Sequence, residues 1–430
     1  MHILILLIGG NPLPNFVITK YLFEERNIDD NIKIKPDLIL LIHTTETERF
    51  ARKLKKAAEQ HTEKVEFLTL EDSGREPLYI RNKIIEKLEK IKRDTLNVRS
   101  LHLNYIGGTK TMAVQITRTV ENWVTENPGT KFILSDVNPK NHKIVISQNG
   151  VGYPLTGDLR DLLKLTTHQL FQLHDMKIYN EGLDTLSVDK DDLLSFCSNL
   201  LEIYKGSERK NFGKKVTRIG IMYNQIKRDN DKETEEEILK TDNILRLKNQ
   251  IEQKIPTLNN LFSKAETPNT QKIKFVTGGW LEELVQNSLF KLQTQVWPEI
   301  HEIRRSIKAE YEGRTTEIDV IAIQGYQLYL FSCTTANRIS IVKQKAFEAL
   351  YRAEQLGGEH AKVILVSTLF NNYNSNEEMD SEQNIHNLQE LKKDLSQFDA
   401  ARNCIRIGID ELEGEIMGKN TLTEKFKSIF

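Results

Sequence analysis

Continuous apolar runs that end in glycine or in small polar residues recur through the first third of the chain. Ile3 to Ile8 contains no polar residue and is followed by Gly9-Gly10-Asn11-Pro12. Such a run is typical of a strand buried on both faces, as in a parallel sheet covered by helices. Similar strands are expected at Asp37 to Ile42, Val65 to Leu68, Ser100 to Ile106, Lys131 to Leu134 and Lys143 to Ser147. Because helical segments separate them, residues 1–150 are predicted to form a doubly wound, Rossmann-like α/β domain.

A second α/β pattern occupies residues 271–430. A helix opens at Gly278-Gly279-Trp280, and three strands, a helix and a further strand follow. These elements are expected at Ile300 to Ile307, Glu317 to Ile323, Gln327 to Ser332, Ile341 to Leu356 and Lys362 to Ser367. Residues 151–270 are mainly helical in pattern and join the two domains. They include the helical stretch Ile221 to Lys254 and the mixed-charge run Lys227 to Glu237, which is typical of a solvated surface.

Composition excludes several classes of protein. The 60 Lys and Arg residues almost balance the 61 Asp and Glu residues, so the chain does not coat nucleic acid by bulk charge, although a local basic cleft remains compatible. Its three cysteines, Cys197, Cys333 and Cys404, lack zinc spacing and suggest no disulfide framework. The apolar run at Ile3 to Ile8 is too short for a membrane span or a signal peptide. We therefore expect a cytoplasmic protein with no membrane partner.

Gly107-Gly108-Thr109-Lys110 lies where a predicted strand meets a predicted helix. Glycines there let backbone amides approach an anion, and the helix N-terminus adds positive potential. Lys110 would supply a full charge and Thr109 a hydroxyl. The spacing is not that of a P-loop. Taken alone, the motif is also compatible with an ordinary tight turn.

Two other polar loops, at Gly9 to Asn15 and at His43 to Thr45, follow neighbouring strands and so share the edge at which α/β sheets bind ligands. With Asn104 to Ala113, these loops resemble the motifs of a CARF domain, the ring-nucleotide sensor of type III CRISPR effectors. The resemblance implies a homodimer that binds one cyclic oligoadenylate across its two-fold axis, and cyclic tetra-adenylate is the ring size we expect. It assigns the ligand to Gly10, Asn11, Thr44, Thr45, Gly108, Thr109 and Lys110, with Asp136 as a further candidate.

Metal-dependent phosphodiester cleavage needs carboxylates that hold Mg²⁺ or Mn²⁺, and it commonly needs a lysine that stabilises charge. The C-terminal pattern offers acids on a helix and on a neighbouring hairpin. These are Glu282 and Glu283, then Glu317 and Asp319. Residues 278–366 resemble the PD-(D/E)xK domain of CRISPR ancillary nucleases, which has a restriction-endonuclease-like fold and follows a CARF domain in the same chain. The resemblance makes Asp319 a metal ligand and Glu283, or else Glu282, the helix acid.

Two hairpin positions depart from that family pattern. Ser332 stands where the family has its second acid, and Thr334 stands where it has its lysine. The backbone carbonyl of Cys333 remains available as a metal ligand. The lysine is expected either to have moved to the following helix, as Lys343 or Lys345, or to be lost together with activity. The alternative for both lysines is an ordinary solvated position.

The sequence therefore predicts a cyclic-oligoadenylate-activated, metal-dependent nuclease of type III CRISPR defence that acts on RNA, single-stranded DNA or both. One rival is a ligand-binding effector whose degenerate nuclease domain only grips nucleic acid or a partner. A second rival is an enzyme that opens its own ring ligand, for which His43 is the only histidine near Lys110.

Overall fold

The structure is a computed structural model of the 430-residue chain. It describes residues 1–23, 35–60, 64–71, 76–95, 97–138, 140–148, 151–154, 157–181, 190–205, 211–216, 274–336, 338–369 and 404–429, with a few single positions between these ranges. The predicted charge run at Lys227 to Glu237 lies outside the described residues, as does nearly all of the helical stretch at Ile221 to Lys254. Within the described ranges, every helix is too short or too polar to cross a bilayer.

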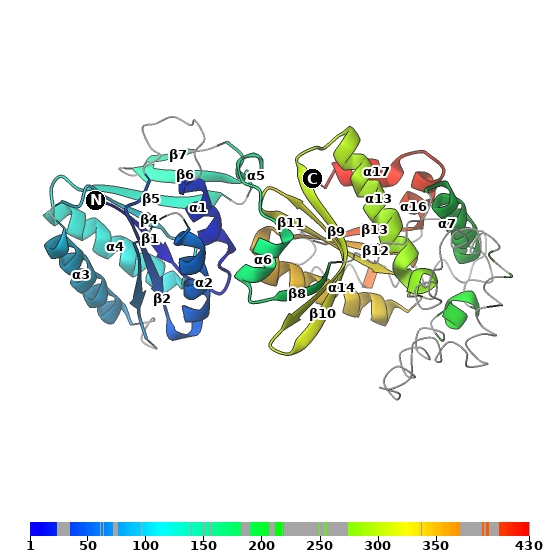
Figure 1. The fold of residues 1–430 in the computed structure, drawn as a ribbon, viewed down its shortest axis with the longest axis horizontal. Helices are drawn as coiled ribbons and strands as arrows, with labels where there is room; N and C mark the ends of the chain where they lie inside the picture. Colours follow the sequence, from blue (N-terminus) through cyan, green and yellow to red (C-terminus); the bar gives the residue numbers. More distant parts are fainter. Residues whose placement is uncertain are drawn as a thin grey trace. The chain divides into compact units, whose positions relative to one another are not determined.

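Contacts divide the chain into two units (Figure 1). The first comprises Met1–Lys177 with two short later segments, Ile323–Gln327 and Glu354–His360, and the second comprises the remainder. The first unit contains β1 (His2–Leu7), α1 (Leu13–Phe23), β2 (Leu38–His43), η1 (Thr45–Thr47), α2 (Glu48–Ala58), β3 (Val65–Thr69), α3 (Pro77–Asp94), β4 (Ser100–Asn104), α4 (Lys110–Glu126), β5 (Lys131–Asn138), β6 (Lys143–Gln148), β7 (Val151–Pro154), α5 (Leu159–Leu162) and α6 (Thr167–Leu173).

The first unit is built on a seven-stranded sheet in the order β3-β2-β1-β4-β5-β6-β7. β1 pairs in parallel with both β2 and β4, and β5 and β6 then pair antiparallel. Helix α3 packs on α4, and α1 packs on α2, on opposite sides of the sheet (Figure 1). From β1, the strands β2 and β3 are added on one side of the sheet, and β4 and β5 are added on the other. This arrangement confirms the predicted Rossmann-like domain and places its topological switch point between those two strands.

The second unit contains β8 (Lys177–Glu181), α7 (Lys190–Lys205), η2 (Phe275–Gly279), α13 (Trp280–Gln295), β9 (Ile300–Tyr311), β10 (Arg314–Gln324), β11 (Gln327–Thr334), α14 (Ile339–Gly357), β12 (Lys362–Ser367), β13 (Cys404–Ile407), α16 (Ile409–Ile416) and α17 (Thr421–Lys427). Its six strands have the order β13-β12-β11-β10-β9-β8. The predicted strands at 300–307, 317–323, 327–332 and 362–367 all appear, and the domain is α/β as expected. In the region 151–270, predicted to be mainly helical, the described residues form the helices α5, α6 and α7 together with the strands β7 and β8.

The two faces of this second sheet differ in character. Val320 and Phe331 face an apolar core that also contains Trp280 of α13 and Phe426 of α17. Because side chains alternate along a strand, Asp319 and Ser332 lie on the opposite face. β11 and β12 pair in parallel and are joined by α14. The β11–α14–β12 crossover therefore lays α14 across the face that carries Asp319 and Ser332.

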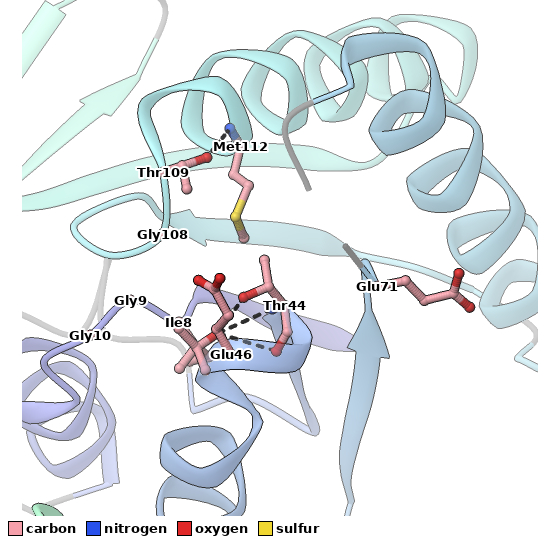
Figure 2. A pocket seen from close by; sticks show the side chains of 10 residues that line it. Ile8, Gly9, Gly10, Thr44, Glu46, Glu71, Gly108, Thr109 and Met112 are labelled. Atoms are coloured by element: carbon pink, nitrogen blue, oxygen red, sulfur yellow. Dashed lines mark hydrogen bonds between the residues drawn. The ribbon is translucent and has the colours of Figure 1, made fainter. Parts of the chain in front are cut away.

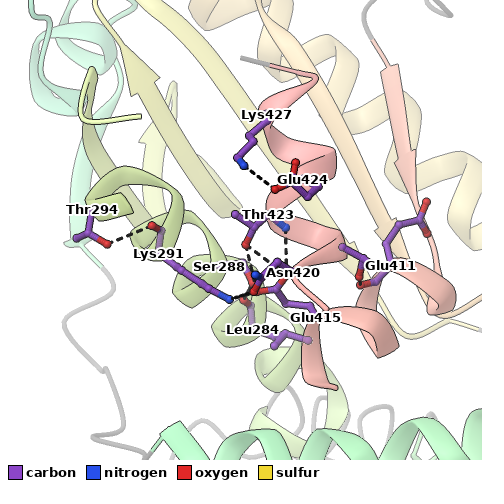
Figure 3. Close-up of polar contacts among 11 residues, drawn as sticks. Leu284, Ser288, Lys291, Thr294, Glu411, Glu415, Asn420, Thr423, Glu424 and Lys427 are labelled. Atoms are coloured by element: carbon purple, nitrogen blue, oxygen red, sulfur yellow. Dashed lines mark hydrogen bonds and ion pairs between the residues drawn. The ribbon is translucent and has the colours of Figure 1, made fainter. Parts of the chain in front are cut away.

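A buried polar cluster fastens α13 to the C-terminal helices (Figure 3). The carboxylate of Glu415 accepts hydrogen bonds from the backbone N–H and the hydroxyl of Thr423, both at 3.1 Å. Its Oε1 also lies 3.0 Å from the ammonium group of Lys291 on α13. Since an isolated buried carboxylate would be costly, these three donors stabilise its charge and fix how α13 lies against α16 and α17.

Candidate functional site: the ligand pocket and the nuclease cleft

Glycines bring the loops after β1 and β4 into direct backbone contact. A Cβ atom on Gly107 would lie 1.9 Å from the carbonyl oxygen of Leu7, and one on Gly9 would lie 3.0 Å from the backbone nitrogen of Gly108. Gly108 has a φ of +74°, in the region that favours glycine. The Asn15 side chain donates to the same Leu7 oxygen at 2.8 Å. The two loops therefore meet where the sheet topology favours ligand binding.

Helix α4 begins at this contact. Thr109 is its N-cap, and the Thr109 hydroxyl accepts a hydrogen bond of 3.1 Å from the Met112 backbone N–H. The following residue, Lys110, is the first of the helix and is exposed. A helix N-terminus carries positive potential and unpaired N–H groups, so this end of α4 favours an anion.

A pocket of about 510 Å³ opens above these loops (Figure 2). This volume lies within the range typical of small-molecule sites, roughly 300–1,000 Å³. Its lining includes four of the predicted ligand residues: Gly10, Thr44, Gly108 and Thr109. The other lining residues are Ile8, Gly9, Glu46, Thr47, Glu71 and Met112. The structure thus brings together residues that follow β1, β2, β3 and β4.

The lining does not include three other predicted ligand residues: Asn11, Thr45 and Lys110. Asn11 accepts a hydrogen bond from the Leu13 backbone N–H at 2.9 Å, which caps α1. Thr45 begins η1 and is exposed, as is Lys110. Asp136 lies on β5 and accepts from its neighbour's backbone N–H at 2.8 Å. Burial raises the pKa of Asp136.

Two acids on the pocket wall were not anticipated from the sequence. Glu46 lies in η1 and Glu71 follows β3. In Figure 2 the Glu71 carboxylate is directed away from the glycine loops. Both residues follow strands of the parallel sheet, so the same edge rule could have found them. Carboxylates repel phosphates, and they accept hydrogen bonds from hydroxyl and amino groups.

His43 is fully built into the fold. Its Nδ1 lies 2.9 Å from the carbonyl oxygen of Thr44, and its Nε2 lies 3.3 Å from the hydroxyl of Thr69. Only 1% of its surface is exposed. A carbonyl oxygen only accepts, so Nδ1 carries the proton and Nε2 accepts from the threonine. With both ring nitrogens occupied, His43 is poorly placed to act as an acid or base on a ligand.

In the second unit, a cleft between the sheet and α14 contains the central nuclease candidate. Asp319, Ser332, Lys345 and Glu348 all line this cleft, whose volume is about 20 Å³. That space is enough for one water molecule or one ion. The Cys333 backbone N–H donates to the Asp319 carboxylate at 2.7 Å. The hairpin therefore holds Asp319 in a defined orientation, and the Cys333 carbonyl as a ligand stays a prediction.

The structure separates the two candidate helix acids. The side chain of Glu283 forms an ion pair with Arg305, and the two are 11% and 7% exposed. Glu282 instead accepts a hydrogen bond from the Ser306 hydroxyl at 2.8 Å. Burial, followed by the negative charge of Asp319, raises the pKa of Glu282 to about 8. Glu282 is thus the acid that interacts electrostatically with Asp319, whereas Glu283 is paired with Arg305.

The two candidate lysines of α14, Lys343 and Lys345, also differ in their surroundings. Lys343 forms an ion pair with Asp394 and does not line the cleft. Lys345 lines it, and its charge acts on Asp319: burial raises the pKa of that carboxyl, whereas the Lys345 ammonium lowers it. Of the two positions considered for a displaced lysine, the structure favours Lys345.

The donor set fits a hard divalent cation. Two partly buried carboxylates whose charges interact, Glu282 and Asp319, are the kind of ligand that Mg²⁺ and Mn²⁺ prefer. Among the described residues, no three His, Cys, Asp or Glu side chains already surround one point. This is compatible with Mg²⁺, which commonly takes one or two protein carboxylates and fills its shell with water and substrate phosphate.

Comparisons with known families match both domains. Residues 3–148 match the Card1 CARF domain, and residues 269–401 match the Card1-like endonuclease domain. The chain belongs to the CRISPR ancillary nucleases. Its CARF domain contains the glycine loops and the pocket, and its endonuclease domain contains the cleft with Asp319. The departure from the nuclease motif at Ser332 and Thr334 stays a prediction from the sequence.

Two solved structures share the fold over nearly the whole chain. Protein VC1899 from Vibrio cholerae is 15% identical, with a TM-score of 0.59 over 99% of this chain and 98% of that one. Can2 from Sulfobacillus thermosulfidooxidans, solved in complex with cyclic tetra-adenylate, is 16% identical, with a TM-score of 0.57 over 97% and 96%. No curated protein sequence matches the chain. These likenesses establish a shared two-domain fold.

Proposed function

We propose that this CRISPR ancillary nuclease is activated by a cyclic oligoadenylate and cleaves RNA, single-stranded DNA or both with Mg²⁺ or Mn²⁺. The observation that carries the proposal is a cleft of the endonuclease domain lined by both Asp319 and Lys345, with the charge of Asp319 also acting on Glu282 of α13. Two carboxylates can hold a divalent cation, and an adjacent ammonium group can stabilise the charge that develops on the phosphate during phosphodiester hydrolysis.

The ligand pocket supports the regulatory half of the proposal. Backbone amides of the glycine loops and the N-terminus of α4 suit ring phosphates, and the Thr44 and Thr109 hydroxyls suit further polar contacts. Glu46 is able to accept from a ribose hydroxyl or an adenine amino group. The Can2 complex holds cyclic tetra-adenylate, which supports this ring size here. A two-fold symmetric ring is best matched by a homodimer, so we propose one ring for two chains.

In the cleft, Glu282 and Asp319 would hold the metal ion, which supplies Lewis acidity and a more acidic bound water. The Ser306 hydroxyl orients Glu282, and the Cys333 backbone N–H orients Asp319. Lys345 brings its positive charge to the same cleft, where it stabilises the negative charge that develops on a phosphate under attack. In this scheme Ser332 contributes shape rather than charge.

The rival function is a ligand-binding effector without cleavage, and the loss of acid and lysine at Ser332 and Thr334 favours it. A cleavage assay separates the two. The full chain is incubated with labelled RNA and labelled single-stranded DNA, with Mn²⁺ or Mg²⁺, across cyclic oligoadenylates of different size. Cleavage that requires both metal and ring supports the proposal. Ring binding without cleavage under any of these conditions supports the rival.

A further inference from the structure

Helix α14 presents a chemically distinct face to the cleft. Lys345, Glu348, Ala349 and Arg352 line it, at positions i, i+3, i+4 and i+7 of the helix. This spacing places them along one face of an α-helix. The small side chain of Ala349 lies between longer charged ones, so the helix approaches the sheet closely while its charged groups reach the cleft.

The same cleft contains the hairpin position that lacks the usual acid. Ser332 is 5% exposed and lines the cleft together with Asp319 and Leu330. A hydroxyl is a weak ligand for a hard cation, so the hairpin supplies one partly buried carboxylate, Asp319. Glu317 also lines the cleft, but its side chain is exposed and pairs with Lys308. The negative charge of Glu348 acts on Asp319, as does the positive charge of Lys345. The negative and positive charges that the hairpin lacks at Ser332 and Thr334 are therefore present on α14, as Glu348 and Lys345.

From this geometry we infer that Glu348 and Lys345 of α14 jointly replace the acid and the lysine absent at Ser332 and Thr334. Glu348 provides the second carboxylate toward the metal ion, directly or through a bound water, and Lys345 provides the charge toward the phosphate. The inference rests on the proposed nuclease function and gives a role to Glu348, which no sequence pattern indicated.

The helix offers matched controls for both residues. Glu354 is the other acid on α14, is exposed and does not line the cleft. Lys343 is the other lysine and is paired with Asp394. Glu348→Gln and Lys345→Ala are therefore compared with Glu354→Gln and Lys343→Ala in the full-length chain. Two readouts are measured: the affinity for Mn²⁺ alone, by titration calorimetry, and the rate of nucleic-acid cleavage with cyclic tetra-adenylate.

The two residues are expected to give different signatures. Glu348→Gln should weaken Mn²⁺ binding on the order of tenfold or more and slow cleavage, because a carboxylate is lost near the metal. Lys345→Ala should leave Mn²⁺ binding unchanged or tighter, since a nearby positive charge is removed, and should slow cleavage on the order of a hundredfold. Neither control should change either quantity by more than about twofold. If Glu348 and Lys345 only stabilised the fold, their variants would not differ in Mn²⁺ affinity while both cleaved more slowly.

A relocation variant completes the test. Ser332→Glu together with Thr334→Lys should restore cleavage to the inactive Lys345→Ala, Glu348→Gln double variant. The inference is overturned if Glu348→Gln binds Mn²⁺ and cleaves as Glu354→Gln does. If the wild type does not cleave, the proposed function fails, and Mn²⁺ affinity alone still decides the role of Glu348. A wild type that neither binds Mn²⁺ nor cleaves overturns both.

Discussion

Removing the positive partner of Glu283 is expected to destabilise the endonuclease domain in a pH-dependent way. Arg305 and Glu283 are 7% and 11% exposed, so neither charge is well hydrated in the folded protein. In Arg305→Met, the long apolar side chain fills much of the volume, and the carboxylate of Glu283 is left without its ion-pair partner. Breaking a buried pair in this way costs roughly 3–5 kcal/mol. For a domain of 150–250 residues, about 3 kcal/mol corresponds to a fall in Tm on the order of 6–12 °C.

The sign of the pH dependence follows from the Glu283 carboxyl. Burial already raises its pKa, and Arg305 lowers it, so the variant raises the folded-state pKa further. A raised pKa means that the folded state binds more protons than the unfolded state, so stability falls as pH rises above the unfolded value. The loss of Tm in Arg305→Met should therefore be larger at pH 8 than at pH 5, as measured by differential scanning calorimetry.

A double variant provides the control for this prediction. Glu283→Leu with Arg305→Met replaces both charges by apolar groups and should recover most of the lost stability, because no unpaired charge remains. If Arg305→Met unfolds at the wild-type temperature at both pH values, the pair is not buried as described. If Glu282, and not Glu283, acts with Asp319, the Glu283→Leu, Arg305→Met double variant should retain cleavage, whereas Glu282→Gln should lose it.

Three further outcomes are expected. Lys110→Ala should weaken cyclic tetra-adenylate binding on the order of tenfold to a hundredfold by calorimetry, since it removes a charge at the start of α4, whereas Lys131→Ala, at the amino end of β5, should not. Equal affinities of Lys110→Ala and Lys131→Ala for the ring would count against a role of the Gly107–Lys110 loop in ligand binding. Gly107→Ala should abolish folding of the CARF domain by circular dichroism, because its Cβ would lie 1.9 Å from the Leu7 oxygen. Light scattering should give a dimer that binds one ring per two chains, and a monomer with one ring per chain would refute the assembly.

The sequence was most informative where burial is complete. β1 and β2 are apolar except for the terminal His2 and His43, so their existence and parallel pairing were predictable, as was the meeting of their polar loops at one edge. β8 was missed because Lys177–Glu181 is short and partly exposed at a sheet edge, where no continuous apolar run is required. A short edge strand has only a weak hydrophobic pattern in its sequence. Whether it forms depends on its pairing with the neighbouring strand in the folded domain.

The nuclease cleft was predictable only in part. Asp319 stood out because it lies on a strand before a hairpin. Glu282 and Glu283 are neighbours on one helix, about 100° apart around its axis, and Lys343 and Lys345 are about 200° apart. Which glutamate interacts with Asp319, and which lysine lines the cleft, depends on how α13 and α14 are rotated against the sheet. Packing of Trp280 and Ala346 in the core sets this rotation, and local sequence does not reveal it.

The central claim is that a ring nucleotide switches on metal-dependent cleavage at Asp319. The most direct measurement is single-turnover cleavage of labelled RNA and single-stranded DNA by the wild type and by Asp319→Asn, with Mn²⁺, with and without cyclic tetra-adenylate. Asparagine can still accept from the Cys333 N–H but loses the charge that binds metal. The account predicts ring-dependent cleavage by the wild type, a loss on the order of a thousandfold in Asp319→Asn, and unchanged ring affinity. Equal cleavage by both proteins, or none by either at saturating ring and metal, would contradict it.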